Sequence, residues 1–405
     1  MTIAQGVKKV LTYKKQTGLG VPASGSGGQQ LRRVTSTINL TKETYQSAEI
    51  RPDQQVADFR HGSRQVSGTL SGELSAGTYA PFIQSVLRRD FAAVAAIPSL
   101  AVTIAASGVN YAVSVSTGTP FLTGGIKVGM VVRLSAAGLN AANSAKNLLV
   151  ISVTATTLTV TPLNGSVMVA EGPISAVAVT ATGKSTYVPE TAQTQDYYTV
   201  EHWFPDVAQS EVYNDVMQTN AQVKIPANGM ATIDFPLVGL NVSTGTSQVL
   251  TTPTAISTSG STAGVNGLLF VAGVPVAIVT SIDFDINGNI AVADAVVGSV
   301  ARPDVFQGTV AATGTFSAYF TDATFRDYFI NETEVSIVVV LTSDATAAAD
   351  FVSFTMSRVK LGDADVSDGA NGLTRSFPFT ALKNVAGGAA LANLATTIMI
   401  QDSLA

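Results

Sequence analysis

The chain has 405 residues, of which 46% are hydrophobic and only 13% charged, with a net charge of −5 and no cysteine. The lack of cysteine excludes disulfide bonds and thiol chemistry, and no run of about 18 apolar residues is present that could span a membrane. A lone globule with so few charges would be poorly soluble, so we expect much of the surface to contact other protein in an assembly.

Residues 1–30 predict a basic N-terminal arm. They contain two pairs of lysines before any long strand pattern begins: Lys8, Lys9, Lys14 and Lys15. Residues 1–42 carry seven basic and no acidic side chains, which leaves a charge of −12 for the remainder of the chain. A basic arm binds nucleic acid or an acidic partner, and because the remainder is acidic we favour a neighbouring copy. No apolar segment of signal-peptide length is present, so we expect synthesis in a cytoplasm.

Residues 31–100 predict the first part of a β-domain that ends in a short helix. Residues 34–40 and 66–74 alternate apolar and polar side chains, which is the pattern of half-buried antiparallel strands. Residues 78–87 instead place apolar side chains at helical spacing, and Pro81 is tolerated in the first turn of a helix.

Residues 101–184 predict a small β-barrel or sandwich inserted into this first domain. Their strand patterns lie at residues 130–134, 148–153, 157–161 and 176–180. The first domain then resumes over residues 185–240, where Asn228-Gly229 predicts the turn of a hairpin. Because the insertion interrupts one half of the chain and not the other, we expect it to fold independently on the outer face.

The second half of the chain predicts another β-domain between two less regular segments. Residues 241–266 are rich in Ser, Thr and Gly and predict a linker. Residues 267–385 carry strand patterns at 278–284, 306–310, 316–320 and 335–339. Residues 322–329 predict a second short helix with Asp322 as its N-cap. Residues 386–405 hold apolar side chains beyond the last strand pattern and predict a C-terminal arm.

An internal repeat relates the two halves. Gly68-Thr69 precedes a strand and the first helix, as Gly308-Thr309 precedes a strand and the second helix, at an offset of 240. Residues 34–40 match residues 278–284 at an offset of 244. Each half closes on a Phe-Pro pair, at Phe235-Pro236 and Phe377-Pro378. This constant order predicts a duplicated domain.

Three stretches of the sequence resemble the phage tail tube proteins. They are the strand–strand–helix unit at residues 64–82, the later stretch from residues 302–309 through 328–334, and the lysine-rich arm that runs into residues 17–22. The resemblance covers residues 1–100 and 184–385. It implies a mainly β fold of two tandem tail-tube β-sandwich or barrel domains, each with a short helix, plus the inserted small β-domain.

The resemblance also implies a structural role in the virion tail. In this family the sheets of six domains join into a continuous barrel around a lumen, which removes exposed sheet edges. Three copies with two domains each would form a ring of pseudo-sixfold symmetry, and stacked rings would form the tube of a siphovirus-like tail. The implied partners are further copies, the tape measure protein, the tail terminator and distal tail proteins, and DNA that passes without specific binding.

The polar faces of the predicted strands supply candidates for the lumen. Glu73, Asp283 and Asp285 lie at polar positions of alternating segments. Acidic side chains there would repel DNA phosphates, whereas basic ones would hold them. The alternative is that these residues lie on the outer surface. The four paired lysines of the N-terminal arm, and the C-terminal arm, are the candidates for contacts between rings.

The sequence offers little for catalysis or metal binding. Residues 283–294 match the spacing of a calcium loop, but the first part alternates as a strand and Asn287-Gly288 is a strong hairpin signal, so we favour a hairpin. The two histidines, His61 and His202, lack the context of a nucleophile elbow. We therefore expect no catalytic residue, cofactor or metal, and the alternative function is a β-rich virion decoration protein or a host-binding adhesin.

Overall fold

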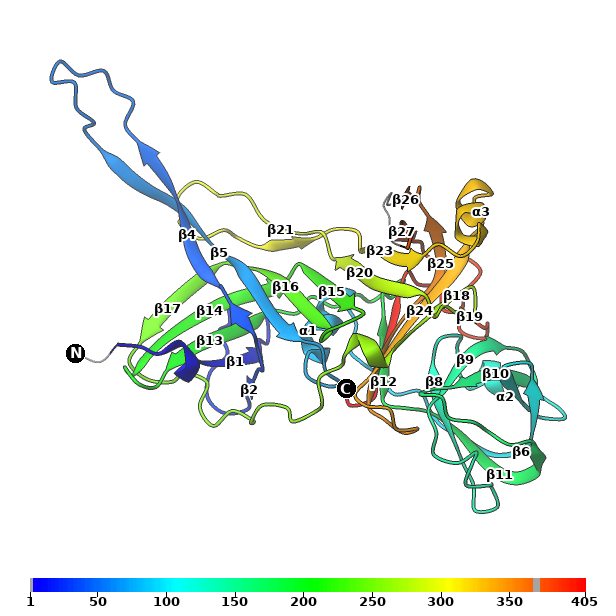
Figure 1. The fold of residues 1–405 in the computed structure, drawn as a ribbon. Coiled ribbons are helices and arrows are strands. Elements are labelled where there is room, and N and C mark those ends of the chain that lie inside the picture. Colours follow the sequence, from blue (N-terminus) through cyan, green and yellow to red (C-terminus); the bar gives the residue numbers. More distant parts are fainter. Residues whose placement is uncertain (1–2, 367–371) are drawn as a thin grey trace.

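The computed structural model describes residues 3–366 and 372–405, and this part of the chain is mainly β, as predicted (Figure 1). It contains three short α-helices: α1 (Ala80–Leu87), α2 (Pro120–Thr123) and α3 (Thr324–Ile330). The first and last confirm the two predicted helices. Asp322 lies one residue before the N-cap of α3 rather than at it, and its Oδ1 accepts a hydrogen bond of 2.9 Å from the Thr324 amide.

One antiparallel sheet runs through both halves of the chain, and we call it the wall sheet. Its strands follow the order β4, β5, β16, β15, β20, β23, β27, β26, with β3 beside β5 at the first edge. Their bounds are β3 (Thr35–Ser36), β4 (Asn39–Gln46), β5 (Phe59–Glu73), β15 (Asn220–Pro226), β16 (Thr232–Gly239), β20 (Val279–Asn287), β23 (Ala311–Tyr319), β26 (Asp365–Val366) and β27 (Thr374–Ala381). The β15–β16 hairpin around Asn228-Gly229 confirms the predicted turn, with Val223 opposite Ile233.

Two smaller groups of strands pack against the wall sheet and are also hydrogen-bonded to it, through β14 (Gln209–Gln218) with β16 and through β25 (Phe351–Leu361) with β27. The first is β2 (Gln29–Gln30), β1 (Val10–Lys15), β13 (Tyr198–Phe204), β14 (Gln209–Gln218) and β17 (Asn241–Gly245). The second is β19 (Val274–Pro275), β18 (Gly267–Val271), β24 (Val335–Thr342), β25 (Phe351–Leu361), β28 (Met399–Asp402) and β12 (Lys184–Tyr187). A separate pair, β21 (Ile290–Val292) and β22 (Val305–Gln307), lies between β20 and β23 in the chain. Short 3-10 turns occupy Gly6–Lys8 and Gly264–Asn266.

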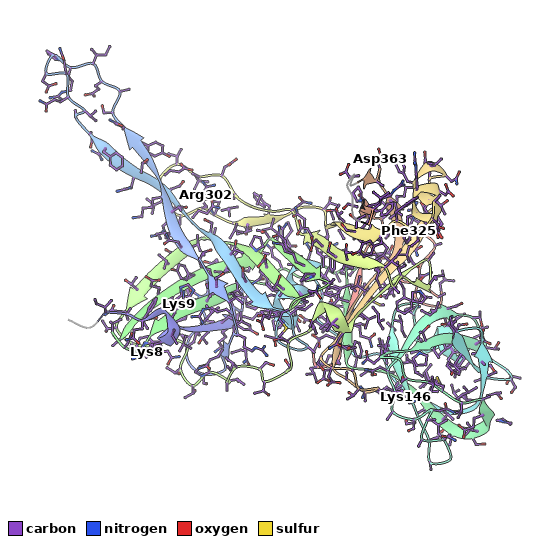
Figure 2. All side chains as sticks on the ribbon, in the orientation of Figure 1. Lys8, Lys9, Lys146, Arg302, Phe325 and Asp363 are labelled. Carbon is purple, nitrogen blue, oxygen red and sulfur yellow. The ribbon has the colours of Figure 1, made fainter. Side chains whose placement is uncertain are left out.

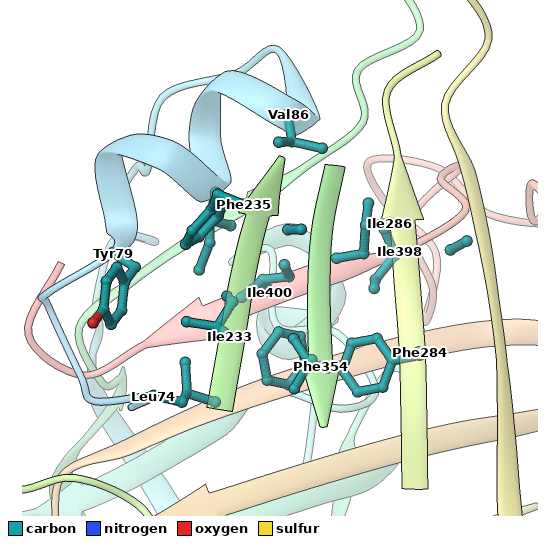
Figure 3. Packing of buried hydrophobic residues seen from close by; sticks show 14 of the residues in the cluster. Leu74, Tyr79, Val86, Ile233, Phe235, Phe284, Ile286, Phe354, Ile398 and Ile400 are labelled. Atoms are coloured by element: carbon teal, nitrogen blue, oxygen red, sulfur yellow. The ribbon is translucent and has the colours of Figure 1, made fainter. Parts of the chain in front are cut away.

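The main core lies between the wall sheet, α1 and the smaller sheets (Figure 3). Strand β16 shows the alternation that builds it, because Ile233, Phe235 and Leu237 are buried while the residues between them are not. Phe284 on β20 packs edge-on against Phe354 of β25, with ring centroids 4.9 Å apart. This core is continuous across both halves, so burial of apolar surface holds them together as one body.

The two halves of the wall sheet share one strand register. Leu40 lies opposite Val66 in the β4–β5 pair, and Ile286 lies opposite Ala312 in the β20–β23 pair. Ile286 follows Leu40 by 246 residues, and Ala312 follows Val66 by the same number. Gly68 and Gly314 are counterparts at the same offset: a Cβ on Gly68 would lie 2.6 Å from the Ile38 Cα, and one on Gly314 would lie 2.6 Å from the Asp283 carbonyl oxygen. The predicted offsets of 240 and 244 are therefore wrong, because Gly314-Thr315, not Gly308-Thr309, occupies the position of Gly68-Thr69.

The insertion forms a closed barrel with its own core. Its strands follow the order β10, β7, β6, β11, β8, β9, and α2 packs Phe121 inside. Their bounds are β6 (Ile97–Ser107), β7 (Asn110–Ser114), β8 (Val131–Ser135), β9 (Leu148–Val153), β10 (Thr157–Pro162) and β11 (Glu171–Ala181). The barrel also shares an apolar contact with the second half of the chain, through Leu149 and Leu163 against Phe270 and Phe351.

Three segments expected to be irregular take part in sheets instead. The predicted linker begins with β17, which pairs with β14. The predicted N-terminal arm contains β1, whose Leu11 and Tyr13 are buried. The predicted C-terminal arm ends in β28, between β12 and β25, with Ile400 fully buried. In each case the segment buries an apolar side chain and pairs with a strand outside the segment. These contacts order the segment, although its local composition is that of an irregular one.

Candidate assembly surface

The face of the wall sheet opposite the core is polar. Two adjacent rows of cross-strand neighbours run over β5, β16, β15, β20, β23 and β27. The first row is Glu73, Thr232, Lys224, Asp283, Thr315 and Pro378. The second row is Ser71, Asp234, Gln222, Asp285, Thr313 and Thr380. The middle of this face forms a shallow concavity. The three predicted lumen residues, Glu73, Asp283 and Asp285, therefore lie on one face of one sheet.

The two rows carry four carboxylates and one ammonium group. Lys224 lies opposite Asp283, and its Nζ is 3.4 Å from Asp234 Oδ2. The remaining groups in the rows are hydroxyls, one amide and a proline. These two rows are thus acidic and rich in hydroxyls, and their single cation, Lys224, is already next to two carboxylates.

Asp285 joins the two halves of the chain. It accepts hydrogen bonds of 3.0 and 2.8 Å from the side-chain amide of Asn220, across the β15–β20 pair. Burial raises the pKa of Asp285 above its ordinary value, and the hydrogen bond from Asn220 opposes that rise. Asp283 is exposed by comparison. Asn220 was not among the residues predicted from the sequence, because its importance depends on which two strands meet.

Glu73 is held at the edge of the polar face. Its Oε2 accepts a hydrogen bond of 2.9 Å from the Ser261 hydroxyl, and Arg32 donates to the same hydroxyl at 2.7 Å. The side chain of Glu73 is therefore turned toward a network within the first half of the chain. Its charge still belongs to the polar face, but it is less free than that of Asp283.

The four predicted arm lysines have different surroundings. Lys14 donates to the carbonyl groups of Ser24 and Ser26, and Lys15 pairs with Asp196 at 2.9 Å, so both have partners within the chain. Lys9 donates to the Ser36 carbonyl, and burial together with the charge of Arg33 lowers its pKa. Lys8 lies exposed at the end of the first 3-10 turn, next to Lys9 (Figure 2). Of the four, only Lys8 has an ammonium group without a hydrogen bond or ion pair to another described residue.

His202 lies in an arrangement that resembles part of a catalytic triad. Its Nε2 is 2.9 Å from the Ser36 hydroxyl, and its Nδ1 is 3.9 Å from a Glu211 carboxylate oxygen. Burial, followed by the positive charges of Lys9 and Arg33, lowers the pKa of His202 to about 3. A neutral imidazole that acts as a general base becomes positively charged as it accepts a proton, and the two neighbouring cations oppose that step. We therefore assign this histidine to packing between β3 and the sheet of β13. His61, in contrast, is exposed on β5.

The segment with calcium-loop spacing is extended. Residues 283–287 belong to β20, so successive side chains alternate between its two faces and the oxygens do not converge. Within the described residues, no group of three or more Asp, Glu or His side chains is placed to bind a metal. The predicted tight turn at Asn287-Gly288 is wrong: the Gly288 amide donates to the Thr219 carbonyl of the neighbouring turn, and the chain continues into β21.

The two ends of the wall sheet are open. Among the described residues, no strand pairs with the outer side of β4 or with the outer side of β26. Open edges are sites where a sheet can continue into another chain. The alternation of apolar and polar residues does not indicate which strands lie at these edges, although an offset of 246 aligns β4 with β20 of the internal β15–β20 pair.

An extended sheet with one buried face, one polar face and two open edges is typical of a structural β-protein. The match to a family model identifies which kind of structural protein this is. The model of the phage tail tube protein matches residues 6–381, so the chain belongs to the phage tail tube protein family and has a structural role in the virion tail. No significant match to a curated protein was found. No helix in the described part of the chain is long and apolar enough to cross a membrane.

Proposed function

We propose that this chain polymerises into stacked rings of three copies, which form the tube that conducts DNA during ejection. The observation that carries the proposal is the β15–β20 pair, through which the two halves already continue one sheet. A ring of three chains would repeat this junction six times, three times within chains and three times between them. The shared strand register of the halves supports a pseudo-sixfold ring built from a duplicated domain.

The size of the wall sheet supports a ring with an open centre. Each chain contributes eight neighbouring strands, so three chains contribute 24. At about 4.8 Å between strands the circumference would be about 115 Å and the diameter about 37 Å. A strand tilt of roughly 35–45° widens such a barrel further. This leaves room for a DNA duplex after the inward side chains are placed.

The polar face is the side suited to line that channel. The opposite face is covered by α1 and the core, so closing the sheet leaves the two polar rows facing inward. Carboxylates there repel DNA phosphates, and hydroxyl groups keep the wall hydrated without fixed cationic sites. We further propose that the tape measure protein occupies this channel before ejection and that tail terminator and distal tail proteins close the tube ends. The barrel insertion would then decorate the outside of a siphovirus-like tail whose subunits are made in the host cytoplasm.

Electron microscopy of the purified chain tests this function. We expect rings and tubes, with class averages that show six similar wall segments and three barrels per ring. Native mass measurement of single rings should give three chains. Discrete particles that never stack would favour a decoration protein or an adhesin, and twelve wall segments per ring would exclude the trimer.

A further inference from the structure

The internal β15–β20 pair provides a template for the contact between copies. Strands β15 and β26 are counterparts, because Gln222 opposite Asp234 corresponds to Asp365 opposite Ser376. Strands β4 and β20 are counterparts through the 246-residue shift. The open edge of β26 therefore corresponds to the edge of β15, and the open edge of β4 corresponds to the edge of β20 that β15 covers.

Transferring the template gives a definite pairing. Within the chain, Ala221 lies opposite Ile286; their counterparts are Ala364 and Leu40. We propose that residues 38–41 of one copy pair antiparallel with residues 363–366 of the next, with Leu40 opposite Ala364 and Asn39 opposite Asp365. This proposal rests on the ring-forming function above and names the strand edges that would close the ring.

The backbone at both edges is prepared for this pairing. The Leu40 amide donates to its neighbour's side chain, Asn39 Oδ1, at 2.8 Å, and the Ala364 amide donates to Asp363 Oδ1 at 2.9 Å. Both amides thus point away from the sheet and rely on a local side-chain partner. In the proposed pairing each would donate to the carbonyl group of the other residue, which is the hydrogen-bonded pair of an antiparallel ladder.

The side chains also match the template, with one exchange. Asn220 and Asp285 form the amide–carboxylate contact of the internal junction. Their counterparts are Asp363 and Asn39, so the same two groups meet with their positions exchanged. Both are exposed in the single chain. Leu40 and Ala364 are only partly buried against the main core, whereas Ile286 and Ala221 are at most 1% exposed. A second copy at these edges would complete their burial.

Disulfide cross-linking tests the register, because the natural chain has no cysteine. Asn39 and Asp365 would form a non-hydrogen-bonded pair with Cα atoms about 4.5 Å apart, within the range of a disulfide. We expect N39C/D365C to give covalent dimers and trimers that reduction returns to monomers. Within one chain the two positions are seven strand spacings apart, about 34 Å, so an internal bond is excluded. T41C/D365C is the control, because diagonal positions lie about 7–8 Å apart.

A charge exchange tests the side-chain contact independently. N39D would place a carboxylate beside Asp363 and Asp365, and we expect the concentration needed for assembly to rise at least about tenfold. Adding D363N and D365Q recreates the internal arrangement of Asn220, Gln222 and Asp285 and should restore assembly. Thermal unfolding of the unassembled variants verifies that folding is unchanged.

The outcomes separate this proposal from the proposed function. Tubes that form without the N39C/D365C cross-link, or that cross-link equally through the control pair, would overturn the register while leaving the tube function intact. Normal assembly of N39D, or a folded N39D/D363N/D365Q variant that fails to recover, would also overturn it. Wild-type protein that forms no rings under any condition would overturn both.

Discussion

The acidic polar face leads to a direct test of how the tube treats DNA. Its two rows hold Glu73, Asp234, Asp283 and Asp285 against Lys224, a net charge of −3 per chain. A ring of three copies would therefore carry −9 on its wall. Duplex DNA carries about one negative charge per 1.7 Å of its axis, so the wall should repel it throughout its passage.

The perturbation is to reverse this charge without placing like charges directly opposite each other on neighbouring strands. D234N/D283N removes two negative charges, and T313K/T315K adds two positive ones beside the remaining or former carboxylate positions on β20. The charge changes from −3 to +1 per chain, or from −9 to +3 per ring. The cost in folding stability should be small, because the only ion pair lost is the exposed Lys224–Asp234 contact, worth about 0–1 kcal/mol.

The assay is retention of a fluorescent duplex by purified tubes, with and without nuclease. We expect wild-type tubes to retain none, and the fourfold variant to retain duplex that nuclease does not digest. Its affinity should fall with salt at a log–log slope of about −0.9 for each phosphate neutralised. A control with four lysines on the exposed β6–β7 side of the barrel, T103K/A105K/S107K/V109K, should bind duplex that nuclease digests. Wild-type tubes that protect duplex, or a fourfold variant that protects none, would refute an acidic lumen.

Three further predictions concern the single chain and the arms. Gln401 is 1% exposed, and its side-chain amide makes three hydrogen bonds of 2.7–2.9 Å, to the amide and carbonyl of Val131 and to the carbonyl of Thr182. Q401L should therefore lower the free energy of unfolding by about 2–4 kcal/mol in urea titrations. The control Q209L, at an exposed site, should change it by less than about 0.5 kcal/mol. Burial raises the pKa of Asp402 from 3.8 to about 6, so the folded chain binds the proton more tightly than the unfolded chain. The stability contributed by this group should therefore fall by up to about 3 kcal/mol as pH rises from 4 to 6. A D402N variant with the same pH dependence of stability as the natural chain would contradict this. Deleting residues 1–8, which precede the first strand and include the exposed Lys8, should leave ring formation intact but shorten tubes measured by electron microscopy, and unchanged length would exclude a contact between rings through this segment.

Strand alternation predicted the wall sheet well, because one face of each strand packs on the core. The buried residues of β16, β20 and β23 follow the period of two that the sequence shows. The Phe-Pro pairs predicted a repeat, but the offsets of 240 and 244 that were assigned to it differ from the offset between the strand pairs of the structure. Gly-Thr occurs at both 308 and 314, and only the strand register, which relates the β4–β5 pair to the β20–β23 pair, makes Gly314 the counterpart of Gly68.

The first and last strands could not be predicted because their partners lie far away in the sequence. Strand β1 pairs with β13, nearly the whole first half of the chain later, and β28 completes a sheet with β12 and β25. Flanking Gly, Ser and Ala residues give these segments the composition of disordered arms. Tertiary contacts override that local signal, because one buried strand needs only two or three apolar side chains and an open edge.

The same limit applies to the barrel and to the two edges of the wall sheet. The sequence pattern predicted β8, β9, β10 and β11 of the barrel but not β6 and β7. The contact of Leu149 and Leu163 with Phe270 and Phe351 depends on how separate parts of the chain meet. The His202–Ser36 contact likewise joins segments 166 residues apart. Candidate residues on one strand could be named from the sequence, whereas residues that act in pairs needed the three-dimensional arrangement.

A subunit that must join a ring faces opposing requirements. Its sheet edges must bind the next copy, yet open edges promote uncontrolled pairing. In this chain each described edge is short at the proposed contact and carries polar side chains, Asn39 at one end and Asp363 and Asp365 at the other. Two carboxylates on one edge disfavour pairing of that edge with itself, because like charges facing each other are destabilising.

The hydrogen bonds at Leu40 and Ala364 address the same requirement from the backbone. In the single chain each outward amide is satisfied by the side chain that precedes it, so neither edge presents a fully unpaired donor at this position. Exchanging such a local bond for a ladder bond gains little by itself. Closure of the ring must then draw on the burial of Leu40 and Ala364 and on the amide–carboxylate contact between Asn39 and Asp363. Pairing is therefore favourable only in the register where all of these contacts form together.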